Sequence, residues 1–240
     1  MKLNSLAAAA GTAVKEGRST QDAIETIARD LENDIVLGYL NPRERLVEDA
    51  LIDRFQTKRY MVREALSRLE RLGLVERHAN RGALVRALTP TEVEEIYSIR
   101  VILEAAASRE VLHRATADDI EQIIEAQRPH DTAVERGDPR AIFRTNIAFH
   151  RTFFSICGNS ELLGAIDLFA QKAHPIRSVS IARPDYPKRA QAEHWMIIDA
   201  LRDKREQELL TICREHIQVA KDEYIEACRR RFPGEPVRST

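Results

Sequence analysis

The sequence predicts a mainly α-helical fold in two parts: three helices and a β-hairpin, then an all-α antiparallel bundle of about six helices. Two observations support this prediction. Before residue 73, apolar residues recur at helical spacing in three segments, and two short runs of β type follow them. From residue 91 onward the pattern is helical throughout, and the loops are short, as they are between antiparallel neighbours in bundles.

The N-terminal part is expected to contain three helices and a hairpin. Helical spacing of Ile24, Ile27 and Leu31 marks the first helix, and Gly73 can end the third helix as a C-cap. The expected helices cover residues 20–40, 46–55 and 59–72, and the expected strands cover 74–77 and 83–86. Three helices followed by such a hairpin form a winged helix-turn-helix.

The C-terminal part begins after a break at Thr89-Pro90, which makes a plausible linker. Its expected helices cover about 91–113, 117–136, 139–157, 160–181, 187–203 and 205–230. We divide the chain into a flexible tail (1–18), the winged helix-turn-helix (19–87), a linker (88–92), the helical domain (93–231) and a C-terminal tail (232–240).

Composition narrows the possible functions of the chain. Aromatic residues are only 5% of the 240, which argues against nucleic-acid binding on stacked aromatic side chains. The formal net charge is −1, so any surface that binds nucleic acid must be local. No apolar run is long enough to span a membrane, and the three separated cysteines suit a reducing cytoplasm. We therefore expect a cytoplasmic protein without a membrane partner.

The third predicted helix and the hairpin carry a local excess of positive charge. From Lys58 to Arg81 there are seven Lys or Arg against three Glu. Such a face is typical of a helix that enters the major groove, where Arg can pair with guanine and long cations neutralise phosphates. Residues at the N-terminal end of that helix should reach the bases, namely Lys58, Arg59, Tyr60 and Arg63. The alternative is a solvated helix face, which suits Arg68 and Arg71.

The segment LVEDALIDRFQTKRYMVREALSRLERLGLVERHANRGALV resembles the N-terminal domain of the GntR family of regulators, and the resemblance spans residues 20–87 without a gap. The strongest match is VREALSRLERLGLV, followed by the wing glycine, Gly82. The resemblance implies that Arg59 and Arg63 contact DNA and that Gly82 lets the wing approach the minor groove beside Arg81. It also implies a homodimer on palindromic double-stranded DNA. In one departure, Asp49 stands where the family usually has Arg; in the other, Lys58-Arg59-Tyr60-Met61 replaces the usual Ser/Thr-Arg-Thr-Pro turn.

Four residues of the helical part form a candidate metal site. Asn146 and His150 are spaced i, i+4 and share one helix face, while His194 and His216 lie on two later helices. Three imidazoles and one oxygen donor can bind a metal in a bundle core. The alternative is that these are surface or hydrogen-bonded core histidines, which are more common than metal ligands.

Residues 92–228 resemble the FCD ligand-binding domain of the FadR subfamily of GntR regulators. The matching stretches are IYSIRVILEAAAS, NIAFHRTFFSICGN, AEHWMIIDAL and REHIQVAK. Many such domains bind a divalent metal through one Asp and three His, and these positions fall on Asn146, His150, His194 and His216. Zinc or nickel is the expected ion. Asn146 departs from the usual Asp and lacks its charge, which should weaken binding or change the preferred metal.

The resemblance also places Arg100 at a position that faces the ligand, where its planar guanidinium suits a carboxylate. The alternative is a surface arginine or a buried ion pair with Glu104, four residues on. Six helical stretches rather than seven indicate the VanR-like branch of the subfamily, so we expect a small organic acid and not an acyl-CoA.

These observations predict a sequence-specific DNA-binding regulator, a repressor, controlled by a small carboxylate at a metal site. One alternative is a regulator whose metal site is vestigial. Another is a metalloenzyme that activates water, but no motif places a carboxylate as a general base, so we expect no enzymatic activity.

Overall fold

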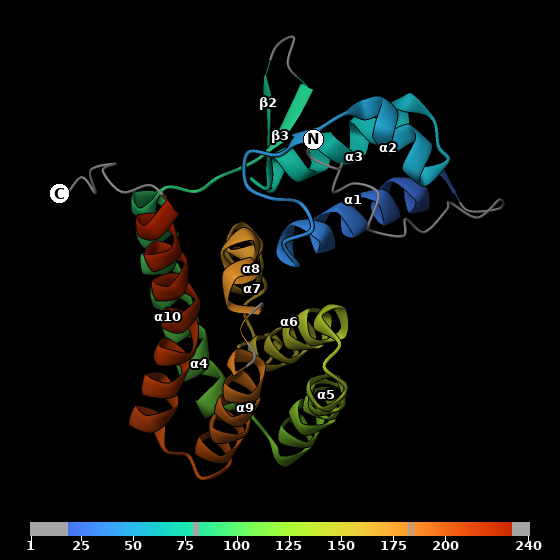
Figure 1. The fold of residues 1–240 in the computed structure, drawn as a ribbon. Helices are drawn as coiled ribbons and strands as arrows, with labels where there is room; N and C mark the ends of the chain where they lie inside the picture. Colours follow the sequence, from blue (N-terminus) through green and yellow to red (C-terminus); the bar gives the residue numbers. More distant parts are fainter. Residues whose placement is uncertain (1–18, 79–81, 182, 184, 232–240) are drawn as a thin grey trace. The chain divides into compact units, whose positions relative to one another are not determined.

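A computed structural model of the protein describes residues 19–78, 82–181, 183 and 185–231, and the chain forms two compact units that divide between Leu88 and Thr89 (Figure 1). No helix among the described residues combines the length and the apolarity needed to cross a bilayer.

The first unit has three helices and a small antiparallel sheet, the architecture of a winged helix-turn-helix. Ser19 caps the first helix, because its side chain accepts a hydrogen bond from the backbone N–H of Asp22. In the sheet the strand order is β1-β3-β2, with Arg45 opposite Leu84 and Val75 opposite Val85. The elements are α1 (Thr20–Val36), β1 (Arg45–Leu46), α2 (Glu48–Phe55), α3 (Arg59–Arg71), β2 (Val75–His78) and β3 (Gly82–Val85).

The core of this unit joins the predicted apolar helix faces to the sheet. Helix α1 packs on α3, and α2 also packs on α3. The fully buried side chains include Ile27, Leu31, Phe55, Leu66 and Leu69. The two-residue strand β1 was not predicted. The predicted helix 46–55 therefore begins two residues later, at Glu48, because Leu46 pairs with Ala83 of β3.

A buried ion pair links α1 to α2 in this unit. Arg54 Nη2 lies 2.6 Å from Asp34 Oδ2, and the two side chains are only 7% and 0% exposed. Removing one partner of such a pair leaves the other charge buried without compensation. Arg54→Ala is expected to lower the free energy of unfolding by about 3–5 kcal/mol, measured by urea unfolding of the full-length protein.

A matched control for this variant is available on the surface. Arg128 and Glu125 form an exposed pair at 2.9 Å, so Arg128→Ala should change the free energy of unfolding by no more than about 1 kcal/mol. Equal effects of the two variants would contradict a special role for the buried pair.

The second unit is entirely helical in its described residues. Capping boxes begin two of its helices: Thr89 pairs with Glu92, and Thr116 pairs with Asp119. In Figure 1, α4 runs beside α10, and α5 packs on both α6 and α9. The helices are α4 (Pro90–Arg114), α5 (Ala117–Arg136), α6 (Pro139–Ser155), α7 (Ser160–Lys172), α8 (His174–Ile181), α9 (Tyr186–Arg202) and α10 (Glu206–Arg231).

The helix predicted over 160–181 is in fact two helices, α7 and α8, which meet at Ala173. Pro175 explains the break, since it has no N–H to donate to the carbonyl of Gln171, four residues earlier. The described part of this unit therefore has seven helices where about six were expected, because one predicted helix is divided in two.

Candidate functional site

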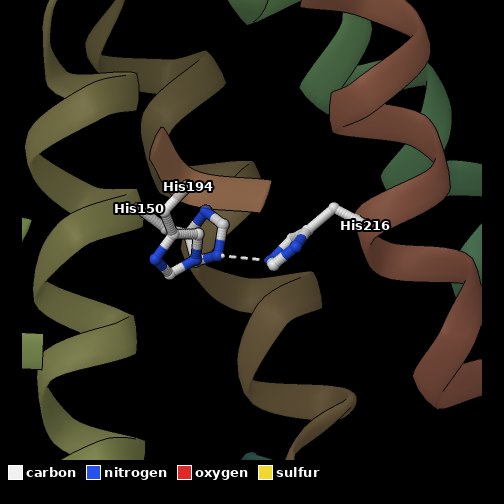
Figure 2. Close-up of side chains that lie close together, drawn as sticks. All are labelled: His150, His194 and His216. Atoms are coloured by element: carbon white, nitrogen blue, oxygen red, sulfur yellow. Dashed lines mark hydrogen bonds between the residues drawn. The ribbon is translucent and has the colours of Figure 1, made fainter. Parts of the chain in front are cut away.

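Three histidines from three different helices meet in the interior of the helical unit. His150 lies on α6, His194 on α9 and His216 on α10, and Figure 2 shows their rings pointing toward one another. One ring nitrogen from each lies within 4.8 Å of the other two, and the two Nε2 atoms of His150 and His216 are 3.1 Å apart. Distant segments of the sequence thus converge on one point.

Two polar side chains orient these imidazoles from outside the cluster. Gln127 donates its amide N–H to Asp131, so its Oε1 accepts from His194 Nδ1 at 2.9 Å. The carboxylate of Glu193 accepts from His216 Nδ1 at 2.7 Å. Because Nδ1 carries the proton in both rings, each Nε2 presents a lone pair. Outer partners of this kind fix the tautomer and orientation of histidines that bind metals.

The surroundings keep two of the three rings neutral. Burial lowers the pKa of His150 and of His194 well below the ordinary value, and the nearby ring of His216 lowers both further. Phe149 stacks on His194 with 3.9 Å between the ring centroids. Neutral imidazole is the state that binds metal, so no proton has to leave these two rings at neutral pH.

The cluster fits a divalent ion of the tetrahedral type. His194 Nε2 is buried and has no hydrogen-bond partner, and such an orphaned atom is costly unless something binds it. Zinc–nitrogen bonds of about 2.0–2.1 Å place tetrahedral ligand atoms roughly 3.3 Å apart, close to the 3.1 Å between His150 and His216. Three histidines would leave at least one coordination position for another ligand.

Asn146 lies one turn before His150 on α6 and lines a small cavity of about 20 Å³. Among the described residues, no side-chain hydrogen bond joins Asn146 to the three clustered histidines. His130 lines the same cavity, and its ring centroid is 5.0 Å from that of His194. The cavity walls comprise His130, Ile142, Phe143, Asn146, Arg177, Tyr186, Pro187 and Ala190.

The predicted DNA-contacting residues gather at the start of α3. Lys58 is the N-cap residue of that helix, Tyr60 is 51% exposed, and the side chains of Arg59 and Arg63 are more than half exposed. Gly82 is exposed and begins β3 with φ of +78°, a backbone conformation that favours glycine. Arg81, also predicted to contact DNA, lies outside the described residues.

Acidic residues at the start of α2 bind the two arginines. Arg63 Nε lies 3.0 Å from one carboxylate oxygen of Glu48, and Arg59 Nη1 lies 3.3 Å from the same oxygen. Arg59 Nη2 also pairs with Asp49 at 2.6 Å. Asp49, which departs from the pattern of the family that the sequence resembles, thus binds Arg59 at the start of α3. We refer to Glu48 and Asp49, with the two arginines that they bind, as the acidic clamp.

Comparison with known families and proteins identifies both units. Residues 23–85 match the family described as bacterial regulatory proteins, gntR family, and residues 95–219 match the FCD domain. This chain is a GntR-family regulator with an FCD domain. The resemblance seen in the sequence is confirmed for both parts.

Curated relatives of this GntR regulator are themselves regulators. The Nta operon transcriptional regulator of Aminobacter aminovorans is 27% identical over 80% of this chain and 89% of its own length. A probable D-xylose utilization operon transcriptional repressor of Paenarthrobacter nicotinovorans is 29% identical over 77% of this chain and 81% of its own length.

Solved structures share the fold of this regulator. A putative GntR regulator from Rhodococcus sp. RHA1 has a TM-score of 0.71 at 22% identity and covers 86% of this chain and 99% of its own. E. coli McbR/YncC has a TM-score of 0.69 at 20% identity over 87% of this chain and 98% of its own. The matched domains and relatives are transcription regulators and not enzymes, so the metalloenzyme alternative is set aside.

In the FCD domain of this regulator, Arg100 forms a buried ion pair. Its Nη2 lies 2.8 Å from Glu104 Oε1, and its guanidinium lies over the ring of Tyr97 at 4.9 Å. The sequence left open whether Arg100 contacts a ligand or forms an ion pair with Glu104, and the structure shows the ion pair. A ligand that contacts Arg100 would have to bind beside Glu104.

Three residues of the FCD domain escaped the sequence analysis, namely Gln127, Glu193 and Arg177. The sequence gives a weak indication of Glu193, because this residue directly precedes His194 and follows Arg189 by four residues. In the structure, Arg189 Nε donates a hydrogen bond to Glu193 at 2.6 Å. Gln127 and Arg177 had no signal in the sequence, since their partners and surroundings come from other helices.

Proposed function

We propose that this GntR regulator is a cytoplasmic repressor that binds palindromic DNA as a homodimer and is controlled by a small carboxylate at a metal site. Recognition would use Lys58, Arg59, Tyr60 and Arg63 at the start of α3, with Arg81 and Gly82 in the wing. Two-fold symmetric half-sites require a dimer. The names of relatives that are called repressors favour repression over activation.

The metal would be zinc or nickel, held by His150, His194 and His216, with the amide oxygen of Asn146 as a fourth donor. The observation that carries this proposal is the buried, unpartnered Nε2 of His194 beside two further imidazoles. When bound, the ion supplies a Lewis acid on which a carboxylate oxygen can coordinate. Arg100 would add the positive potential of a buried guanidinium, although its donors already pair with Glu104.

Metal analysis of the full-length protein, purified without a histidine tag, tests this proposal. We expect close to one zinc or nickel ion per chain. After chelation, saturating zinc or nickel should raise the melting temperature by about 5–10 °C, since a ligand at a hundred times its Kd stabilises by about 2.7 kcal/mol.

Magnesium is the control in that experiment, because it prefers oxygen ligands and should leave the melting temperature unchanged. If the protein contained no metal and neither ion raised its melting temperature, the histidines would be a vestigial site and the metal part of the proposal would be wrong.

A further inference from the structure

Asp131 on α5 accepts three hydrogen bonds behind the histidine cluster. Its Oδ1 accepts from Gln127 Nε2 at 2.7 Å, from Gln191 Nε2 at 2.9 Å and from Trp195 Nε1 at 3.4 Å. Gln127 belongs to α5 itself, whereas Gln191 and Trp195 belong to α9, which packs on α5. One carboxylate thus joins the two helices beside His194, the residue that precedes Trp195.

The hydrogen-bond donors to Asp131 are all uncharged. Among the described residues, no lysine, arginine or histidine lies within ion-pair distance of this half-buried carboxylate. Glu193, the carboxylate that accepts from His216, differs in this respect, because it also pairs with Arg189 at 2.6 Å. Removing a carboxylate from water without a counter-charge is costly. A divalent ion held by the histidines would supply that counter-charge.

The carboxylate of Asp131 also fixes the side-chain amide of Gln127, because a carboxylate accepts hydrogen bonds and cannot donate them. The N–H side of the amide faces Asp131, so the oxygen side faces His194, where Gln127 Oε1 lies 2.9 Å from Nδ1. The neutral ring of His194 therefore carries its proton on Nδ1. Its Nε2 is left as a lone pair, buried without a hydrogen-bond partner beside the other two histidines.

A neutral amide in place of this carboxylate removes the constraint. In an Asp131→Asn variant the new N–H group could donate to Gln127, whose amide could then turn over and donate to His194 Nδ1. The proton of the imidazole would move to Nε2, the atom that has to bind the metal ion. The inability of Asp131 to donate is thus transmitted to His194 through two hydrogen bonds.

We propose that Asp131 is a positioning residue for the metal site: it orients Gln127 so that His194 presents Nε2 to the ion, and its charge partly balances that ion. This inference rests on the proposed function for the presence of the metal, and it adds a residue that does not touch the ion. The proposed ligands are neutral, since three are imidazoles and Asn146 would contribute an amide. The negative charge that offsets the ion therefore has to lie outside them.

Zinc affinity and the tautomer of His194 test this assignment on the full-length protein. Competition with a chromophoric chelator measures the zinc affinity, and the emission of Trp195, the single tryptophan of the chain, gives a second measure. Long-range proton–nitrogen correlation spectra of metal-free protein with isotope-labelled histidine show which ring nitrogen carries the proton. In the wild type we expect His194 to be protonated on Nδ1.

The Asp131→Asn variant should bind zinc about 10- to 100-fold more weakly and show signals of His194 protonated on Nε2. Asp131→Glu, which restores the charge, should recover part of the affinity. Adding Gln127→Glu to Asp131→Asn places a carboxylate directly on His194 Nδ1 and should also recover part of it, which a mere loss of packing would not allow. Glu125→Gln is the matched control: it removes the same charge from an exposed position on α5 and should change zinc affinity less than about twofold.

Unchanged zinc affinity in Asp131→Asn, or a loss that neither Asp131→Glu nor Gln127→Glu reduces, would overturn the inference. So would metal-free wild-type protein in which His194 carries its proton on Nε2. Failure of the metal proposal is separate from failure of this inference. Wild-type protein that binds no zinc removes the metal, whereas the tautomer of His194 in the wild type and in Asp131→Asn still decides whether Asp131 sets the proton position of that ring.

Discussion

The His194→Ala variant is expected to lose more than about 100-fold in affinity for zinc or nickel while its affinity for DNA stays within about twofold of the parent protein. His194 contributes the orphaned Nε2 to the cluster and connects it to Gln127 through Nδ1. Two histidines on α6 and α10 remain, but they offer too few protein ligands for a closed site. The residues proposed to contact DNA lie in the other unit, which should fold unchanged. Elemental analysis and competition with a chromophoric chelator measure the metal affinity.

Two further variants separate loss of metal binding from loss of folding. His113→Ala removes an exposed histidine of the same domain and should retain full metal binding. Gln127→Leu keeps all three imidazoles but removes the acceptor that orients His194, and should cost about 10- to 100-fold in metal affinity. Wild-type metal content in His194→Ala, with circular dichroism showing an intact fold, would refute the assignment.

The second large effect is expected from Arg63→Ala, which should weaken specific DNA binding about 10- to 100-fold or more without changing the fold. Arg63 lies in the first turns of α3 with its side chain 57% exposed, where a recognition helix meets the base edges. The substrate would be duplexes selected by the wild-type protein from a random library. Fluorescence anisotropy at several salt concentrations measures both affinity and its salt dependence.

Arg68→Ala provides the control, since Arg68 lies later on the same helix and pairs with Glu25 of α1 at 3.2 Å. We expect its effect on DNA affinity to be less than about threefold. If Arg63→Ala bound the selected duplexes as tightly as the wild type, or if both variants lost affinity equally, the assigned role of Arg63 would be wrong.

Local patterns predicted most of the fold. The helical period of α1 and α3 and the capping residues of α4 and α5 are visible in the sequence, because short-range interactions determine them. The strand β1 could not be predicted, since only its pairing with β3, almost 40 residues later, distinguishes Arg45–Leu46 from the start of a helix. The break at Ala173 could have been predicted, because Pro175 follows two residues later.

The candidate site was predicted only in part. Three of its histidines were found through resemblance to the FCD domain, and their spacing in the sequence would not have brought them together. Their convergence depends on how α6, α9 and α10 pack. The same holds for Arg177, which the packing of the surrounding helices buries in the wall of the cavity.

The acidic clamp has a consequence for how the regulator searches a genome. If Arg59 and Arg63 bind DNA as proposed, they exchange Glu48 and Asp49 for it, and the two carboxylates nearly cancel their charge at a distance. Attraction to phosphates irrespective of sequence is weakened, because that attraction depends on uncompensated positive charge. Competing sites in a chromosome should then retain fewer molecules, and each visit should be shorter. We expect a larger share of the protein to remain available for the few sequences whose base contacts replace both ion pairs.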